Sequence, residues 1–106
     1  MITDPDYARI FTKARCIAWQ QGYALVHHGT TTRDLDLLAV PWSEPACNPK
    51  HLVNRIVDSC QNVIDYHVIE PAAQPHGRLT WTLVFKEFGD PRWIDLSVFN
   101  PIKETD

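Results

Sequence analysis

Residues 27–40 have the sequence HHGTTTRDLDLLAV, and this stretch limits how the fold can be built. A short apolar run, 23–28, is followed by a glycine, and a second run, 35–40, is followed by a proline, so both predict buried strands. Only the six residues 29–34 separate them, whereas two parallel strands need a crossover of a dozen residues or more. We therefore expect adjacent antiparallel strands.

A helix is predicted on each side of this strand pair. Each has a capping residue before a proline in its first turn: Thr3 or Asp4 before Pro5, and Asn48 before Pro49. The first helix ends at the glycine at position 22, and the second follows a proline-containing loop. The apolar residues at helical spacing are Tyr7, Ile10, Phe11, Ala14, Ile17 and Ala18 in the first helix, and Leu52, Val53, Ile56, Val57 and Cys60 in the second.

Three more strands are predicted in the second half of the chain, over 63–69, 77–85 and 93–99. The segment 70–76 contains prolines and is predicted to be a loop, while a turn at 89–91 joins the last two strands as a hairpin. The order helix, strand, strand, helix, strand, strand, strand describes an α+β domain. We expect a mixed sheet of about five strands with the two helices packed on one face.

The composition is that of one ordinary globular domain, so we assign residues 1–106 to a single domain. Hydrophobic residues make up 44% and charged residues 22% of the chain, both near globular averages. The net charge of -3, without a run of Lys or Arg, argues against a long duplex nucleic acid as partner. The acidic start of the chain and the lack of a long apolar stretch predict a cytoplasmic protein with no membrane partner.

Three acidic residues carry the candidate chemistry. Asp34 and Asp36 are two residues apart at the start of a strand, so their carboxylates share a face and repel each other unless a cation lies between them. Asp95 lies in the last predicted strand, on the face opposite Ile94 and Leu96. If the two strands are neighbours, the acids form one cluster whose oxygen ligands favour Mg²⁺ or Mn²⁺.

Other side chains leave alternatives open. Arg33 either neutralises the two acids or contacts a phosphate, and Arg78 either stabilises a phosphoryl group in the same cleft or is a solvated residue beside a loop. His27 and His28 alternate in direction, so at most one faces the cleft. The tryptophans in or beside strands are expected to pack, with base stacking as the alternative; these are Trp42, Trp81 and Trp93.

The spacing of these motifs resembles the DNA polymerase beta-type nucleotidyltransferase superfamily. The shared pattern is a Gly-Thr pair at 29–30 where the superfamily has Gly-Ser, an Asp-Leu-Asp at 34–36, and the later acid Asp95. Over residues 22–101 the amino-acid sequence more closely resembles small nucleotidyltransferase-like proteins of tailed phages and prophages. The connection between the Gly-Thr pair and the first acid is shorter than is usual in the superfamily.

This resemblance implies a minimal nucleotidyltransferase fold that transfers a nucleoside monophosphate from a nucleoside triphosphate to an unidentified hydroxyl acceptor. It implies two Mg²⁺ or Mn²⁺ ions held by the acids, the third of which also acts as base. The implied catalytic and metal-binding residues are Asp34, Asp36 and Asp95, and the implied phosphate-contacting residues are Gly29 and Thr30. Together with the two arginines whose alternatives are given above, the predicted nucleotide-binding residues are Gly29, Thr30, Arg33 and Arg78.

A non-catalytic binding module with the same fold is the alternative function. Such a module would be a phage or prophage accessory factor, or one component of a toxin-antitoxin pair, in the host cytoplasm if phage-encoded. It would act alone, as a homo-oligomer or with a partner protein. The hydroxyl acceptor, the base of the nucleotide and the oligomeric state are left open by the sequence.

Overall fold

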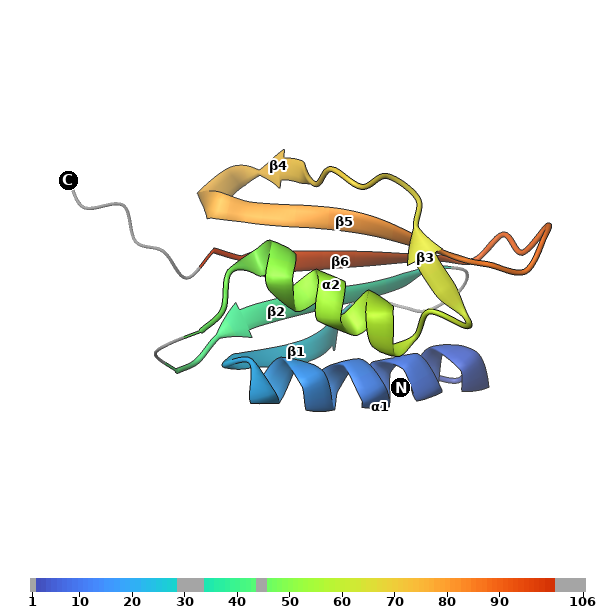
Figure 1. Ribbon diagram of the computed structural model, residues 1–106, viewed down its shortest axis with the longest axis horizontal. Coiled ribbons are helices and arrows are strands. Elements are labelled where there is room, and N and C mark those ends of the chain that lie inside the picture. The colour runs from blue at the N-terminus through green and yellow to red at the C-terminus, as the bar shows by residue number, and fades with distance from the viewer. Residues whose placement is uncertain (1, 29–33, 44–45, 101–106) are drawn as a thin grey trace.

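The computed structural model describes residues 2–28, 34–43 and 46–100, which form an α+β fold (Figure 1). Helices α1 (Pro5–Gln20) and α2 (Pro49–Ser59) cover one face of a mixed sheet. The strands are β1 (Tyr23–His28), β2 (Leu35–Pro41), β3 (Ile64–Tyr66), β4 (Ala72–Gln74), β5 (Arg78–Phe85) and β6 (Trp93–Phe99), with a short 3-10 turn, η1 (Pro75–Gly77), before β5. The predicted fold class and mixed sheet are confirmed.

The last strand of the chain lies in the middle of the sheet. The strand order is β1-β2-β6-β5-β3, and β4 also pairs with β5. β1 and β2 are antiparallel, as their short connection predicted, whereas β2 and β6 are parallel. β5 and β6 form the antiparallel hairpin expected from the turn between them.

The edge of β5 is where the structure differs from the prediction. The strand predicted over 63–69 is shorter in the structure, and the segment predicted as a loop, 70–76, contains the additional strand β4. β3 pairs only with residues 83–85 of β5, and β4 pairs with residues 78–80. The loop prediction was wrong at 72–74 because pairing with the remaining edge of β5 satisfies backbone groups there, which local composition does not reveal.

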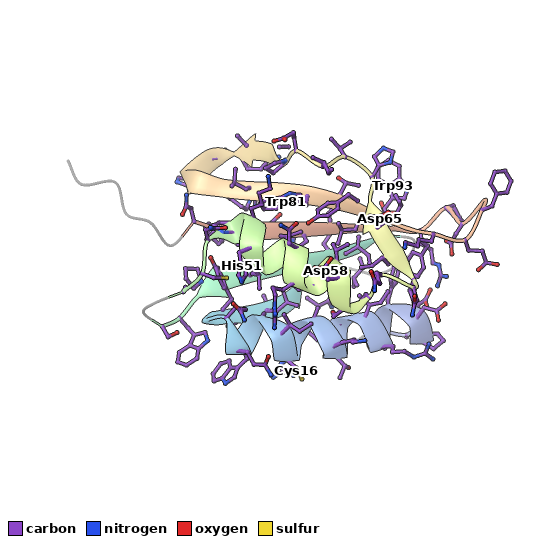
Figure 2. All side chains as sticks on the ribbon, in the orientation of Figure 1. Cys16, His51, Asp58, Asp65, Trp81 and Trp93 are labelled. Carbon is purple, nitrogen blue, oxygen red and sulfur yellow. The ribbon has the colours of Figure 1, made fainter. Side chains whose placement is uncertain are left out.

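The core lies between the sheet and the two helices. Alternate residues of the central strands point into it, and Trp81, labelled on β5 beside α2 in Figure 2, is only 1% exposed. The other buried strand residues of β2, β5 and β6 are Leu35, Leu37, Ala39, Leu83, Phe85, Ile94, Leu96 and Val98, with Ser97 as the buried polar one. The opposite face of these strands is therefore left for polar residues. No helix within the described ranges is long and apolar enough to cross a membrane.

The other two tryptophans that the sequence predicted to pack are only partly covered. Trp42 is 51% exposed and stacks on Trp19 with 4.2 Å between the ring centres. Trp93 is 42% exposed and its ring centre lies 5.1 Å from that of His67. The packing expectation therefore applies in full to the tryptophan of β5 alone.

A charge cluster fastens the start of α1 to the β5–β6 hairpin. Asp4 caps the helix by accepting backbone N–H groups of its first turn, and Arg92 donates to Asp4 and Asp6 at 2.9 Å and to Asp90 at 2.7 Å. The guanidinium also lies 4.1 Å from the ring centre of Phe85. One arginine thus joins residues from both ends of the chain.

Replacing this arginine should make the protein less stable, and the loss should depend on pH. Hydrogen bonding from Arg92 lowers the pKa of Asp90, so this ion pair stabilises the fold above the unfolded carboxyl pKa of about 4 and is lost as pH falls through the folded value. We expect Arg92→Gln to cost about 2 to 3 kcal/mol in free energy of unfolding at pH 7, because the nearly buried Asp90 loses a charged partner. Urea unfolding at pH 7 and pH 2.5 measures this, and a loss of equal size at both pH values would contradict it.

Two glycines with similar backbone angles should respond differently to substitution by alanine. Gly22 has φ +89°, and a Cβ there would lie 2.9 Å from both the Ala46 Cα and the Ser43 Oγ. Gly89 has φ +82°, and no described atom lies within 4 Å of its Cβ position. We expect a loss of about 1 kcal/mol for Gly89→Ala from the left-handed backbone alone, and about 2 to 4 kcal/mol for Gly22→Ala because a steric clash is added. Chemical denaturation of both variants tests the ranking, which equal losses would refute.

Candidate functional site

Polar side chains form a row across the open face of the sheet. His28 is opposite Asp36 between β1 and β2, Asp36 is beside Asp95 between β2 and β6, and Asp95 is opposite Thr82 between β6 and β5. Residues paired in this way point to the same face, and neighbouring strands lie about 4.8 Å apart. We call these four residues the acidic row.

Asp95 is held in an environment that disfavours its charge. Burial raises the pKa of this carboxyl, the hydrogen bond from Thr82 lowers it, and the negative charges of Asp36 and Asp34 raise it further; the net change is upward. The Thr82 hydroxyl donates to the carboxylate at 3.2 Å. A carboxyl kept near other acids and partly shielded from water is typical of functional sites.

A polar hollow of about 420 Å³ lies beside the acidic row and includes all four of its residues in the wall. The rest of the wall consists of Ala72, Gln74, Arg78, Thr80 and Ser97. The Thr80 and Ser97 hydroxyls are hydrogen-bonded to each other at 2.9 Å. The Nε atom of Arg78 is buried and has no hydrogen-bond partner within the described part of the chain.

The structure brings three of the sequence-predicted residues together, because Asp36, Asp95 and Arg78 all line the polar hollow. The Gly-Thr pair at 29–30 and Arg33 lie outside the described residues. Arg78 therefore lies in the wall of the hollow, in agreement with the position that one of its two sequence alternatives required. The structure also places His28, rather than His27, on the wall.

Asp34 lies just before β2 and does not line the hollow among the described residues. Its charge nevertheless acts on the site, since it contributes to the raised pKa of Asp95. The charge of Asp34 also affects Tyr7 of α1. Burial is the main cause that raises the pKa of Tyr7 to about 12, and the charge of Asp34 is the second cause. Asp34 is thus an electrostatic neighbour of the acidic row.

The sequence interpretation missed the hydroxyl residues of the site. Thr80 and Thr82 alternate with the buried Trp81 and Leu83 along β5, so a period-two pattern was present that assigns both threonines to the polar face. The alternation does not predict the strand register that brings Thr82 opposite Asp95. That register depends on the hairpin between β5 and β6.

The residues that could hold a metal ion on this face are the paired carboxylates of Asp36 and Asp95. Within the described ranges, no group of three or more His, Cys, Asp or Glu side chains is arranged to hold a metal ion. The neighbouring carboxylates of Asp36 and Asp95 are present, and Mg²⁺ is commonly held by one or two carboxylates while substrate phosphates and waters supply the other ligands.

No protein-family model matches the chain, and a search of curated proteins finds no match. The chemical features of the chain are the register of its strands, the polar hollow and the sequence motifs. These features restrict the chemistry to ligands that suit carboxylates, hydroxyls and one arginine.

Removing one of the paired acids should stabilise the metal-free protein. A raised carboxyl pKa means that Asp95 contributes to stability below its unfolded pKa, and that this contribution is lost as pH rises through the folded value. We expect Asp95→Asn to unfold at a higher urea concentration than wild type at pH 7 without metal, with a smaller difference at pH 3. Asn keeps an oxygen that can accept from Thr82. The exposed Asp65 on β3, labelled in Figure 2, supplies the control Asp65→Asn. A lower midpoint for Asp95→Asn at pH 7 would refute the expectation.

Proposed function

We propose that this protein is a metal-dependent nucleotidyltransferase that moves a nucleoside monophosphate from a nucleoside triphosphate to a hydroxyl group. The observation that carries the proposal is the pairing of Asp36 with Asp95 on the open face of the sheet. The polar hollow beside them provides room for a substrate, and Arg78 gives it a cation. The motif spacing described above supports the same chemistry.

In this proposal the two paired carboxylates hold a divalent ion together with the phosphates of the nucleotide. The ion, when bound, supplies positive charge to the phosphates. The acceptor oxygen attacks the α-phosphorus, the bond from that phosphorus to the bridging oxygen breaks, and pyrophosphate leaves. Asp95 takes the proton of the acceptor hydroxyl, since burial and the charge of Asp36 strengthen it as a base.

The remaining residues take the roles that the sequence predicts for them. Asp34 is a further metal ligand beside the paired carboxylates of Asp36 and Asp95. The Gly-Thr pair at 29–30 and Arg33 contact the phosphates of the nucleotide. Two ions complete the proposal, the second one depending on the ligands that the substrate supplies.

A non-catalytic module that binds a nucleotide or a protein is the second candidate. It is favoured by one observation, which is that no trio of metal-ligating side chains is assembled among the described residues. In such a module, the row of acids and hydroxyls would recognise a ligand without bond cleavage. Binding and turnover therefore have to be measured separately.

Mn²⁺ binding in the presence of a non-hydrolysable nucleoside triphosphate, followed by electron paramagnetic resonance, tests the site. We expect nucleotide-dependent binding of Mn²⁺ to wild type, and a loss in affinity of about tenfold or more in Asp36→Asn, because a charged ligand is removed. Asp65→Asn, an exposed carboxylate on another strand, should behave as wild type.

Transfer of label from each α-labelled nucleoside triphosphate then separates the two candidates. Release of pyrophosphate by wild type but not by Asp36→Asn supports the enzyme. Nucleotide-dependent Mn²⁺ binding without any transfer supports the binding module. Identical Mn²⁺ binding by wild type and Asp36→Asn would refute the proposed metal site.

A further inference from the structure

The polar hollow has two chemically different ends. The acidic row forms one end, and the turn between β4 and β5, where Gln74 pairs with Arg78, forms the other. Arg78 is four residues from Thr82 along β5, which corresponds to about 13 Å of strand. A ligand that contacts both ends must therefore carry two different groups several ångströms apart.

At the far end, Arg78 is not ion-paired with any carboxylate of residues 2–28, 34–43 and 46–100. Arg78 supplies the hollow's positive charge, as the one Lys or Arg among the described lining residues. Its buried Nε has no partner within the described ranges, and a buried polar atom left in this way costs free energy that a ligand can recover. The guanidinium fork matches the oxygens of a phosphate or a carboxylate.

The wall between the two ends suits hydroxyl groups. Thr80 and Ser97 bond to each other, Thr82 bonds to Asp95, and Gln74 adds an amide. None of the described lining residues is Phe, Tyr or Trp, and the one imidazole, that of His28, belongs to the acidic row, so the wall between the two ends has no aromatic ring on which a nucleobase could stack. The hollow is thus better matched to a polyhydroxylated ligand than to a base.

The triphosphate is assigned to the other end of the hollow by the proposed function. The motif that resembles a phosphate-binding turn follows β1, and β1 ends at His28, which belongs to the acidic row. Arg78 lies at the opposite end, beyond Thr80 and Ser97. The guanidinium of Arg78 is therefore available to the second substrate, the hydroxyl acceptor.

We propose that the polar hollow is the acceptor site, and that the acceptor is a small, hydroxyl-rich anion of the sugar phosphate class, with its anionic group on Arg78 and a hydroxyl at Asp95. This inference rests on the proposed function and names the acceptor class for it. A hollow of about 420 Å³ is in the range of small-molecule sites and holds a molecule of monosaccharide size. The reaction then joins the nucleoside monophosphate to the sugar hydroxyl and releases pyrophosphate, with the hydroxyl proton passing to Asp95.

Calorimetric titration without nucleotide or metal tests the inference independently of catalysis. The ligands are ribose 5-phosphate, ribose and inorganic phosphate, and the proteins are wild type, Arg78→Gln and the control Arg9→Gln on the exposed side of α1. We expect ribose 5-phosphate to bind wild type about tenfold more tightly than ribose or inorganic phosphate. Arg78→Gln should remove most of that preference, whereas Arg9→Gln should retain it.

Three results would overturn the inference. Equal affinity for ribose and ribose 5-phosphate would show that the phosphate group does not contribute to binding. Equal affinity for ribose 5-phosphate and inorganic phosphate would show that the sugar hydroxyls do not contribute. Loss of triphosphate binding in Arg78→Gln, with ribose 5-phosphate binding unchanged, would assign the arginine to the nucleotide.

The outcomes also separate this inference from the proposed function. Nucleotidyl transfer that depends on Asp36 but not on Arg78, with no preference for phosphorylated acceptors, would keep the enzyme and overturn the acceptor class. An Arg78-dependent preference for ribose 5-phosphate without any transfer would support the anion site and count against the enzyme.

Discussion

The parallel pairing of β2 with β6 is the interaction on which the rest of the structure depends. One register places Leu35 beside Ile94 and Leu37 beside Leu96 in the core, and the same register places Asp36 beside Asp95 on the opposite face. Burying each of these four apolar side chains contributes about 1.5 to 3 kcal/mol, whereas two carboxylates at the spacing of neighbouring strands repel each other by about 1 to 4 kcal/mol. The free energy gained by burying the apolar side chains therefore exceeds the repulsion between the carboxylates, and the core holds the two acids close together.

The fold class could be predicted because local constraints determined it. The six-residue link before β2 excluded parallel pairing of β1 with β2, and alternation along β5 and β6 showed which residues point inward. The position of β6 between β2 and β5 could not be predicted in the same way, since strand order depends on contacts far apart in the sequence. β4 has little local strand preference in Ala72 and Ala73, so its pairing with β5 is a tertiary effect.

The same distinction applies to the candidate site. The spacing of the Asp-Leu-Asp motif predicted the face of Asp36, and the alternation of β6 predicted the face of Asp95. Neither pattern determines that His28 and Thr82 lie level with them, because this depends on the register of three strand pairs at once. The sequence left two alternatives for the position of Arg78, and its place in the wall of the hollow follows from the pairing of β4 with β5, which the sequence does not reveal.

Two acids in this chain, Asp90 and Asp95, have opposite electrostatic environments. Asp90 receives three hydrogen bonds from the Arg92 side chain, and its pKa is lowered, so its charge stabilises the fold. Asp95 is bonded to the neutral hydroxyl of Thr82 beside Asp36, and its pKa is raised, so its charge is tolerated at a cost in stability. An arginine within reach of the acidic row would have removed that cost, yet Arg78 lies at the far end of the hollow. The separation leaves the carboxylates able to bind a cation and the arginine able to bind an anion, which is the polarity that the proposed pair of substrates requires.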